Sequence, residues 1–121
     1  GRIRALEALS DWLPRDADVQ ADLAESYQAA GRAEAAEAAY RRALMLGASD
    51  APTHFRYGRL LLSLGRKDEG VASLRRALAV DPGNYVIRKQ IWALENPGRF
   101  YDGGIDWDWQ KEQSQREAAA N

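Results

Sequence analysis

Residues 40–50 read YRRALMLGASD, and residues 74–84 read LRRALAVDPGN. The block RRAL begins at Arg41 and begins again at Arg75, 34 positions later. A fixed period of this length, with matching apolar and small residues, is typical of a stacked helical repeat. Further pairs of glycine, alanine and other small residues obey the same offset, namely Gly31 and Gly65, Ala36 and Gly70, and Ala43 and Ala77.

Each unit is expected to contain two helices joined by a turn. In the first unit, Leu23, Tyr27 and Ala30 lie at helical spacing. Gly31 follows them, and glycine readily adopts the left-handed conformation that ends many helices. The second helix is expected from about residue 33 to residue 46, where the alanine-rich composition favours helix.

The second unit repeats this plan with its own start and stop signals. Pro52 follows Asp50 by two residues, and proline is tolerated in the first turn of a helix. Gly65 again ends the first helix. Residues 81–84, DPGN, form a breaker cluster, and Asn84 can cap a following helix.

These two units resemble the tetratricopeptide repeat family. The family pattern places a leucine, a small residue and a tyrosine in the first helix, a glycine at the turn, and a small residue, an aromatic and an alanine in the second helix. The chain departs from it at Ala48, in place of proline, and at Leu61 and Leu74, in place of aromatics. The matching residues are Leu23, Ala24, Tyr27, Gly31, Ala36, Tyr40, Ala43, Gly58, Gly65, Gly70, Ala77 and Pro82.

The resemblance covers residues 17–84 and implies an all-α fold. We expect a right-handed α-superhelix of stacked antiparallel helix pairs, with capping helices at both ends. A repeat cannot bury its apolar faces alone, so the flanking residues are expected to complete the core. The expected single domain contains a helix of a partial upstream repeat at 1–14, repeat 1 at 17–50, repeat 2 at 51–84, the first helix of a partial third repeat at 85–96, and a C-terminal loop and capping helix at 97–121.

The C-terminal segment breaks the period. Residues 99–106 are predicted to form a loop, and Asp106 can cap a last helix that begins near Trp107. That helix is apolar only at its beginning, so its later part is expected to be solvated and frayed. The segment offers a route to self-association. Its aromatic residues either fold over the end of the stack or form an exposed patch for a partner; they are Phe100, Tyr101, Trp107 and Trp109.

Residues 86–110 carry a second, weaker resemblance. The stretch VIRKQIWALENPGRFYDGGIDWDWQ is similar to the C-terminal segment of bacterial redoxin-type proteins in which a thioredoxin-like domain is joined to helical repeats. This resemblance implies an accessory region of a larger redox protein. Its redox cysteines would lie elsewhere, because the chain has no cysteine.

Composition narrows the range of partners. The 17 basic and 18 acidic residues nearly cancel, which argues against a nucleic-acid-binding surface. No apolar run approaches the roughly 20 residues that span a bilayer. Because the chain begins with Gly1 rather than Met, we expect a processed form or a fragment. The absence of cysteine leaves the compartment open between a bacterial cytoplasm and periplasm.

Residues with catalytic or metal-binding chemistry are scattered rather than grouped. His54 is the only histidine, and no serine or threonine forms a readable catalytic arrangement with it. The carboxylates Asp102, Asp106 and Asp108 lack the spacing and closing glutamate of an EF-hand. The sequence therefore predicts neither an enzyme nor a cofactor or metal site.

The remaining candidate for a functional site is a surface that could bind another protein. The resemblance implies that the first helix of each unit lines a concave groove that holds extended peptides or partner helices. We expect a non-catalytic protein–protein interaction module, with a partner of unknown identity; the alternative is an accessory or oligomerisation region of a redoxin-like protein. Arginine and lysine in the groove could hold a carboxylate, or Arg56 and Arg59 could simply pair with acidic residues of the adjacent helix. The candidate groove residues are Asp22, Glu25, Phe55, Arg56, Arg59 and Lys89.

Overall fold

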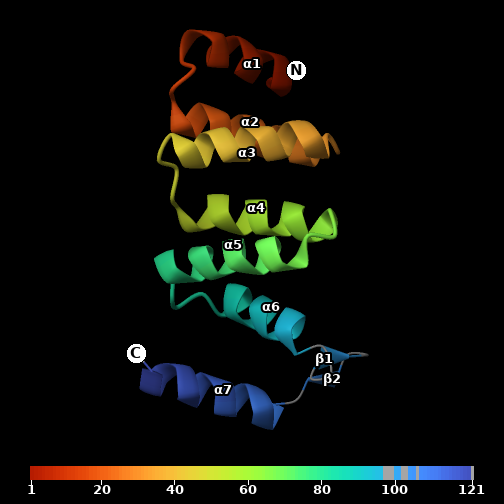
Figure 1. The fold of residues 1–121 in the computed structure, drawn as a ribbon, viewed down its shortest axis with the longest axis vertical. Helices are drawn as coiled ribbons and strands as arrows, with labels where there is room; N and C mark the ends of the chain where they lie inside the picture. Colours follow the sequence, from red (N-terminus) through yellow and green to blue (C-terminus); the bar gives the residue numbers. More distant parts are fainter. Residues whose placement is uncertain (97–99, 102–103, 106, 121) are drawn as a thin grey trace.

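The computed structural model is a stack of helices that runs from α1 at one end to α7 at the other (Figure 1). It describes residues 1–96, 100–101, 104–105 and 107–120, with side chains for residues 1–96 and 111–118. The elements are α1 (Arg2–Trp12), α2 (Ala17–Ala29), α3 (Ala33–Met45), α4 (Ala51–Ser63), α5 (Lys67–Val80), α6 (Tyr85–Glu95), β1 (Phe100–Tyr101), β2 (Gly104–Ile105) and α7 (Trp107–Ala120).

The predicted pairing of helices is confirmed. The most extensive packing lies within the pairs α2–α3 and α4–α5, which are the two repeats. Helix α1 packs on α2, and α6 packs on α5, so the helices flanking the repeats cover their open faces. The fold is therefore an all-α helical-repeat solenoid. The segment predicted as a loop at residues 99–106 differs from the prediction in one respect. It contains the short strands β1 and β2, which pair in antiparallel fashion.

The predicted helix boundaries follow from local chemistry. Gly31 and Gly65 both have a φ of 77°, the left-handed conformation that ends α2 and α4. The side chain of Asn84 accepts a hydrogen bond of 3.2 Å from the backbone N–H of Ile87 and so caps α6. Asp16 caps α2 in the same way. The predicted cap at Asp106 lies outside the described residues.

Small residues bring the two helices of each repeat close together. A Cβ added at Gly70 in α5 would lie 2.8 Å from Leu62 in α4, and one added at Gly58 would lie 3.0 Å from the carbonyl oxygen of Gly70. In the first repeat, the side chains of Ala24 and Ala36 are completely buried. These small positions therefore permit close packing of the two helices.

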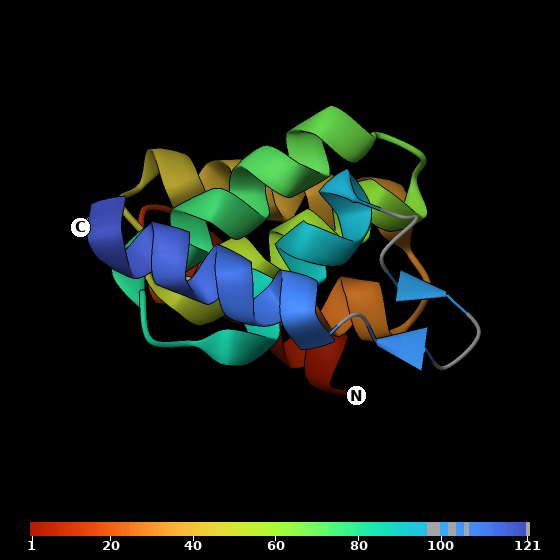
Figure 2. The ribbon, with the colours of Figure 1, turned by 90° about the horizontal axis from the view of Figure 1, so that it is seen from below.

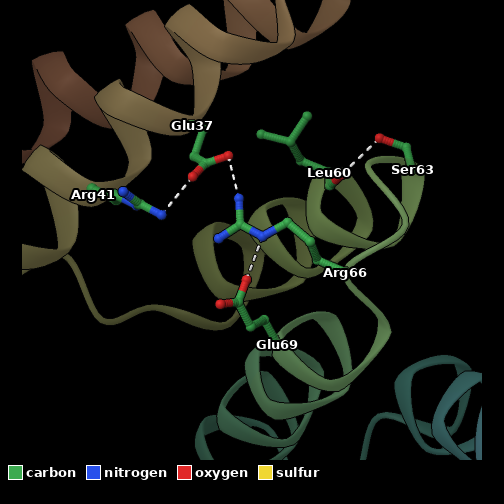
Figure 3. Close-up of polar contacts among 6 residues, drawn as sticks. All are labelled: Glu37, Arg41, Leu60, Ser63, Arg66 and Glu69. Atoms are coloured by element: carbon green, nitrogen blue, oxygen red, sulfur yellow. Dashed lines mark hydrogen bonds and ion pairs between the residues drawn. The ribbon is translucent and has the colours of Figure 1, made fainter.

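An aromatic contact and an ion-pair network join the two repeats. The rings of Tyr40 in α3 and Tyr57 in α4 stack with centroids 5.4 Å apart. Beside them, Glu37 binds Arg41 at 2.5 Å and Arg66 at 2.6 Å (Figure 3). Arg66 also contacts Glu69 at the start of α5 (Figure 3). The network thus links α3 to the turn that precedes α5.

The two RRAL blocks occupy equivalent places. The side chains of Arg41 in α3 and Arg75 in α5 are 57% and 56% exposed, and each forms an ion pair with a glutamate. Arg41 pairs with Glu37 of its own helix, whereas Arg75 reaches Glu95 of α6. The sequence repeat therefore corresponds to a structural repeat.

Helix α7 lies beyond α6 at the end of the stack (Figures 1 and 2). It remains helical as far as Ala120, although most of the side chains described in it are exposed, as predicted for a solvated helix. Its later part is anchored rather than free. The carboxylate of Glu117 accepts a hydrogen bond of 3.0 Å from Trp92 Nε1 and forms an ion pair with Arg88.

Candidate functional site

A cavity of about 470 Å³ opens between α4 and α6. Helix α4 supplies one wall, the turn after α5 supplies the base, and the first turn of α6 supplies the other wall. The cavity therefore lies where the first helices of two successive units face each other. Its lining consists of Ala51, Pro52, Phe55, Arg56, Arg59, Asp81, Asn84, Val86 and Ile87.

The two walls are largely apolar. Phe55 is partly buried and packs against the core cluster that holds α4, α5 and α6 together. Val86 stands opposite on α6 with 67% of its surface exposed, whereas the neighbouring Ile87 is buried. An exposed valine beside a fixed aromatic ring offers an apolar contact surface for a ligand.

Two arginines border the cavity with different partners. Arg56 Nη1 lies 3.4 Å from Glu25 Oε2, and both side chains are more than 40% exposed. Exposed ion pairs of this kind contribute little to stability, so a ligand carboxylate can compete for Arg56. The guanidinium of Arg59 lies over the Phe55 ring, 5.9 Å from its centroid. Of the predicted pairs between these arginines and α2, the one found among the described residues joins Arg56 to Glu25.

A chain of two hydrogen bonds, which runs from the buried Tyr40 to the exposed backbone carbonyl of Arg56, supports the Arg56 side of the cavity. Gln28 Nε2 donates to the backbone carbonyl of Arg56 at 3.3 Å, and the Tyr40 hydroxyl donates to Gln28 Oε1. Burial raises the pKa of Tyr40 to about 12. The hydroxyl therefore keeps its proton and remains a donor at neutral pH. This chain fixes the position of the α4 backbone from which Arg56 projects.

The structure brings four of the six predicted groove residues to the cavity between α4 and α6. Phe55, Arg56 and Arg59 line the cavity, and Glu25 reaches its edge through Arg56. Asp22 in α2 and Lys89 in α6 are not part of the lining. Neither is His54, which is 8% exposed within the helix packing.

Sequence reasoning missed other members of the lining. Pro52 lies in the first turn of α4, and Asp81 and Asn84 belong to the turn before α6. The sequence does mark these residues, because Pro52 indicates the start of a helix and Asp81 and Asn84 belong to the breaker cluster DPGN. Residues at such boundaries lie where consecutive units meet, so a residue with a conformational role can also line a cavity between units. Asp81 gives the cavity one carboxylate beside its two arginines.

The site shows no sign of metal chemistry. Among the described residues there is no group of three His, Cys, Asp or Glu side chains that could hold a metal ion. In the same part of the chain, no helix has the length and apolar character needed to cross a bilayer. The chemistry available in the cavity is apolar contact together with recognition of charge by arginine.

Comparison with known families agrees with the fold. A family model described as Tetratricopeptide repeat matches residues 29–89, a little more than half of the chain. The chain therefore belongs to the tetratricopeptide repeat family. Such repeats typically mediate protein–protein interaction and are in general non-catalytic.

A search of curated proteins found no match to the chain. The resemblance of residues 86–110 to redoxin-type proteins is not supported by either comparison. The aromatic side chains on which that resemblance partly depends, within residues 97–110, lie outside the described side chains.

Proposed function

We propose that this chain is a non-catalytic interaction module that binds an extended peptide segment or a partner helix in the cavity between α4 and α6. The observation that supports the proposal is the combination of Phe55 and exposed Val86 with two arginines around a space of about 470 Å³. Family membership supports a protein partner in general.

The charges of the cavity favour a particular class of segment. Arginine binds carboxylates through two parallel hydrogen bonds, and Arg56 is held only by an exposed ion pair. An apolar side chain would fill the space between Phe55 and Val86. The favoured ligand is therefore a segment in which an apolar residue is adjacent to an aspartate or glutamate.

The proposal is tested with a random-peptide phage library selected on the immobilised chain. Selected peptides are synthesised, and their affinities are measured by calorimetry against the native chain and a double variant, Arg56→Ala with Arg59→Ala. We expect peptides that combine apolar and acidic residues. Because hydrogen bonds to charged groups contribute about 1.5–3 kcal/mol, the double variant should bind at least about tenfold more weakly.

The matched control is Arg76→Ala, which removes an exposed arginine of α5 that does not line the cavity. This variant should bind the same peptides as tightly as the native chain. Selection of no peptide, or of peptides whose affinity is unchanged in the double variant, would contradict the proposed groove.

A further inference from the structure

Arg88 in α6 joins α7 to the turn that forms the base of the cavity. Its Nη1 donates to the carboxylate of Glu117 in α7, and its Nη2 donates to the backbone carbonyl of Pro82 at 2.7 Å. The side chain of Arg88 is 18% exposed. Because a guanidinium is planar and rigid, both contacts are made by one group of fixed geometry. The position of Glu117 therefore affects the contact with Pro82.

The turn at residues 81–84 shapes one end of the cavity. Asp81 and Asn84 belong to the lining, and Pro82 lies between them in the chain. The backbone N–H of Asn84 donates to the carbonyl of Asp81 at 3.0 Å, and its side chain donates to Asp81 Oδ2 at 3.2 Å. Asn84 also caps α6 through Ile87, which is another lining residue. A displacement of Pro82 would therefore move the base of the cavity and the start of α6 together.

Glu117 is itself held in place by a buried group. Its other carboxylate oxygen accepts a hydrogen bond of 3.0 Å from Nε1 of Trp92, which is 4% exposed. An arginine side chain loses much rotamer freedom when it is ordered. The fixed carboxylate of Glu117 offsets this loss and orients the guanidinium of Arg88 toward Pro82.

Docking of α7 on α6 is an equilibrium that a ligand or a mutation can shift. A polar helix of 14 residues is marginal by itself, and most of the side chains described in α7 are exposed. The C-terminal end of α7 lies on the same side of the stack as the turn that follows α5 (Figures 1 and 2). Glu117 belongs to this end of α7, so the part of the helix that meets Arg88 is also the part nearest the turn.

We propose that docked α7 fixes the base of the cavity, because Glu117 orients Arg88 and Arg88 holds the turn at residues 81–84. Arg88 is a positioning residue, since it does not line the cavity itself. The docked state of α7 thereby favours peptide binding, and an occupied cavity favours docking to the same extent. The effect on peptide binding rests on the proposed function, whereas the coupling between α7 and the turn does not.

Hydrogen exchange of the whole chain, followed by NMR at the backbone amides of Asn84 and Ile87, tests the coupling without a ligand. Coupling between sites commonly amounts to about 5–150-fold, so both amides should exchange at least about fivefold faster in Glu117→Ala. The matched control is Glu112→Ala, which removes an ion pair within α7 and should leave both rates as in the native chain. Unchanged rates in Glu117→Ala would overturn the proposal.

A second variant tests whether the effect passes through Arg88. Arg88→Met removes the contacts with Pro82 and Glu117, so it should also accelerate exchange in the turn. Adding Glu117→Ala to this variant should cause no further acceleration, because the two residues act in series. A further acceleration in the double variant would overturn the assigned route. Circular dichroism checks that α1 to α6 stay helical in each variant.

Peptide affinity measures the consequence for the cavity. Calorimetry with the acidic peptides selected on the native chain should show binding at least about fivefold weaker in Glu117→Ala and unchanged in Glu112→Ala. Faster exchange in the turn with unchanged peptide affinity would overturn the regulatory role of α7. Failure to select any peptide would contradict the proposed function instead, and the exchange rates would still decide whether α7 fixes the turn.

Discussion

At the scale of single residues, a buried polar side chain can be hydrogen-bonded in one unit and lack a hydrogen-bond partner at the equivalent position of the next. Gln20 is 1% exposed, donates to Ser10 and accepts a hydrogen bond of 2.8 Å from Arg42 Nε. The equivalent residue of the second repeat is His54, whose Nδ1 is buried with no partner among the described residues. Two residues differ between the units: His54 replaces Gln20, and Leu44, which has no hydrogen-bonding side chain, stands where Ser10 stands for Gln20.

His54 makes the stability of the second repeat depend on pH. Burial, together with the nearby charge of Arg76, lowers the pKa of His54 below its usual value of about 6.5, and Asp50 opposes this shift. Below about pH 6.5 the unfolded chain therefore binds more protons than the folded chain. The free energy of unfolding should fall as the pH decreases through this value and level off below the pKa of the folded state.

Urea unfolding at pH 7.5 and 5.5 measures this effect in the native chain and in His54→Gln, which introduces the residue found in the first repeat. We expect a larger loss at pH 5.5 for the native chain than for the variant. Because the chain contains one histidine, its pKa can also be read directly from one NMR signal. A pKa at or above 6.5 would show that burial does not control this side chain.

At the scale of helices, one position decides how closely the second helix of a unit can approach. Ala24 and Gly58 occupy it in the two repeats, and Trp92 occupies it in α6. An indole in place of a small residue prevents the close packing seen between α4 and α5. Helix α7 begins at Trp107, six residues later than the period of 34 requires, and contacts α6 through Glu117 instead.

Glu117 should therefore control whether α7 stays on the stack. A polar helix of 14 residues is marginal by itself, so loss of this anchor should release it. We expect hydrogen exchange of the amides in residues 111–118 to become at least about tenfold faster in Glu117→Ala, because a hydrogen bond to a charged group contributes about 1.5–3 kcal/mol.

Glu112→Ala provides the control for this experiment. Glu112 belongs to the same helix and also forms an ion pair, but with Arg116 of α7 itself, and both side chains are more than half exposed. Its removal should change exchange in α7 only slightly. Equal protection of α7 in the native chain and in Glu117→Ala would show that α7 is held by other contacts.

At the scale of the whole molecule, the solenoid depends on the joint between its repeats. Each unit contacts mainly its neighbours, so stability is the sum of the units and of the interfaces between them. Tyr57 is 9% exposed and stacks on Tyr40 across this joint. Removal of the ring in Tyr57→Ala should cost about 3–5 kcal/mol, as large core truncations do.

The same variant should also uncouple the repeats. We expect a broader urea transition with a smaller slope, because the units would then unfold in separate steps. Tyr57→Phe is the matched control, since it keeps the ring and should retain a single sharp transition. Circular dichroism during urea titration distinguishes the two results. A sharp transition in Tyr57→Ala would mean that the ion pairs of Glu37 suffice to couple the repeats.

The sequence alone determined the repeat, because its signals are local. Glycine at the turns, proline and asparagine at helix starts, and small residues at a period of 34 each act within their own helix or hairpin. These features predicted the helix pairs and most helix boundaries. Phe55, Arg56 and Arg59, which α4 supplies to the cavity, were expected in a groove because of the family resemblance.

Only the tertiary structure decided which residues meet between units. The position of α6 relative to α4 excludes Asp22 and Lys89 from the cavity and adds Asp81 and Asn84 to it. The contact between Arg88 and Glu117 likewise depends on how α7 packs on α6. Such choices depend on the angle and distance at which separate helices pack, and these are set by many side chains together rather than by any one local signal.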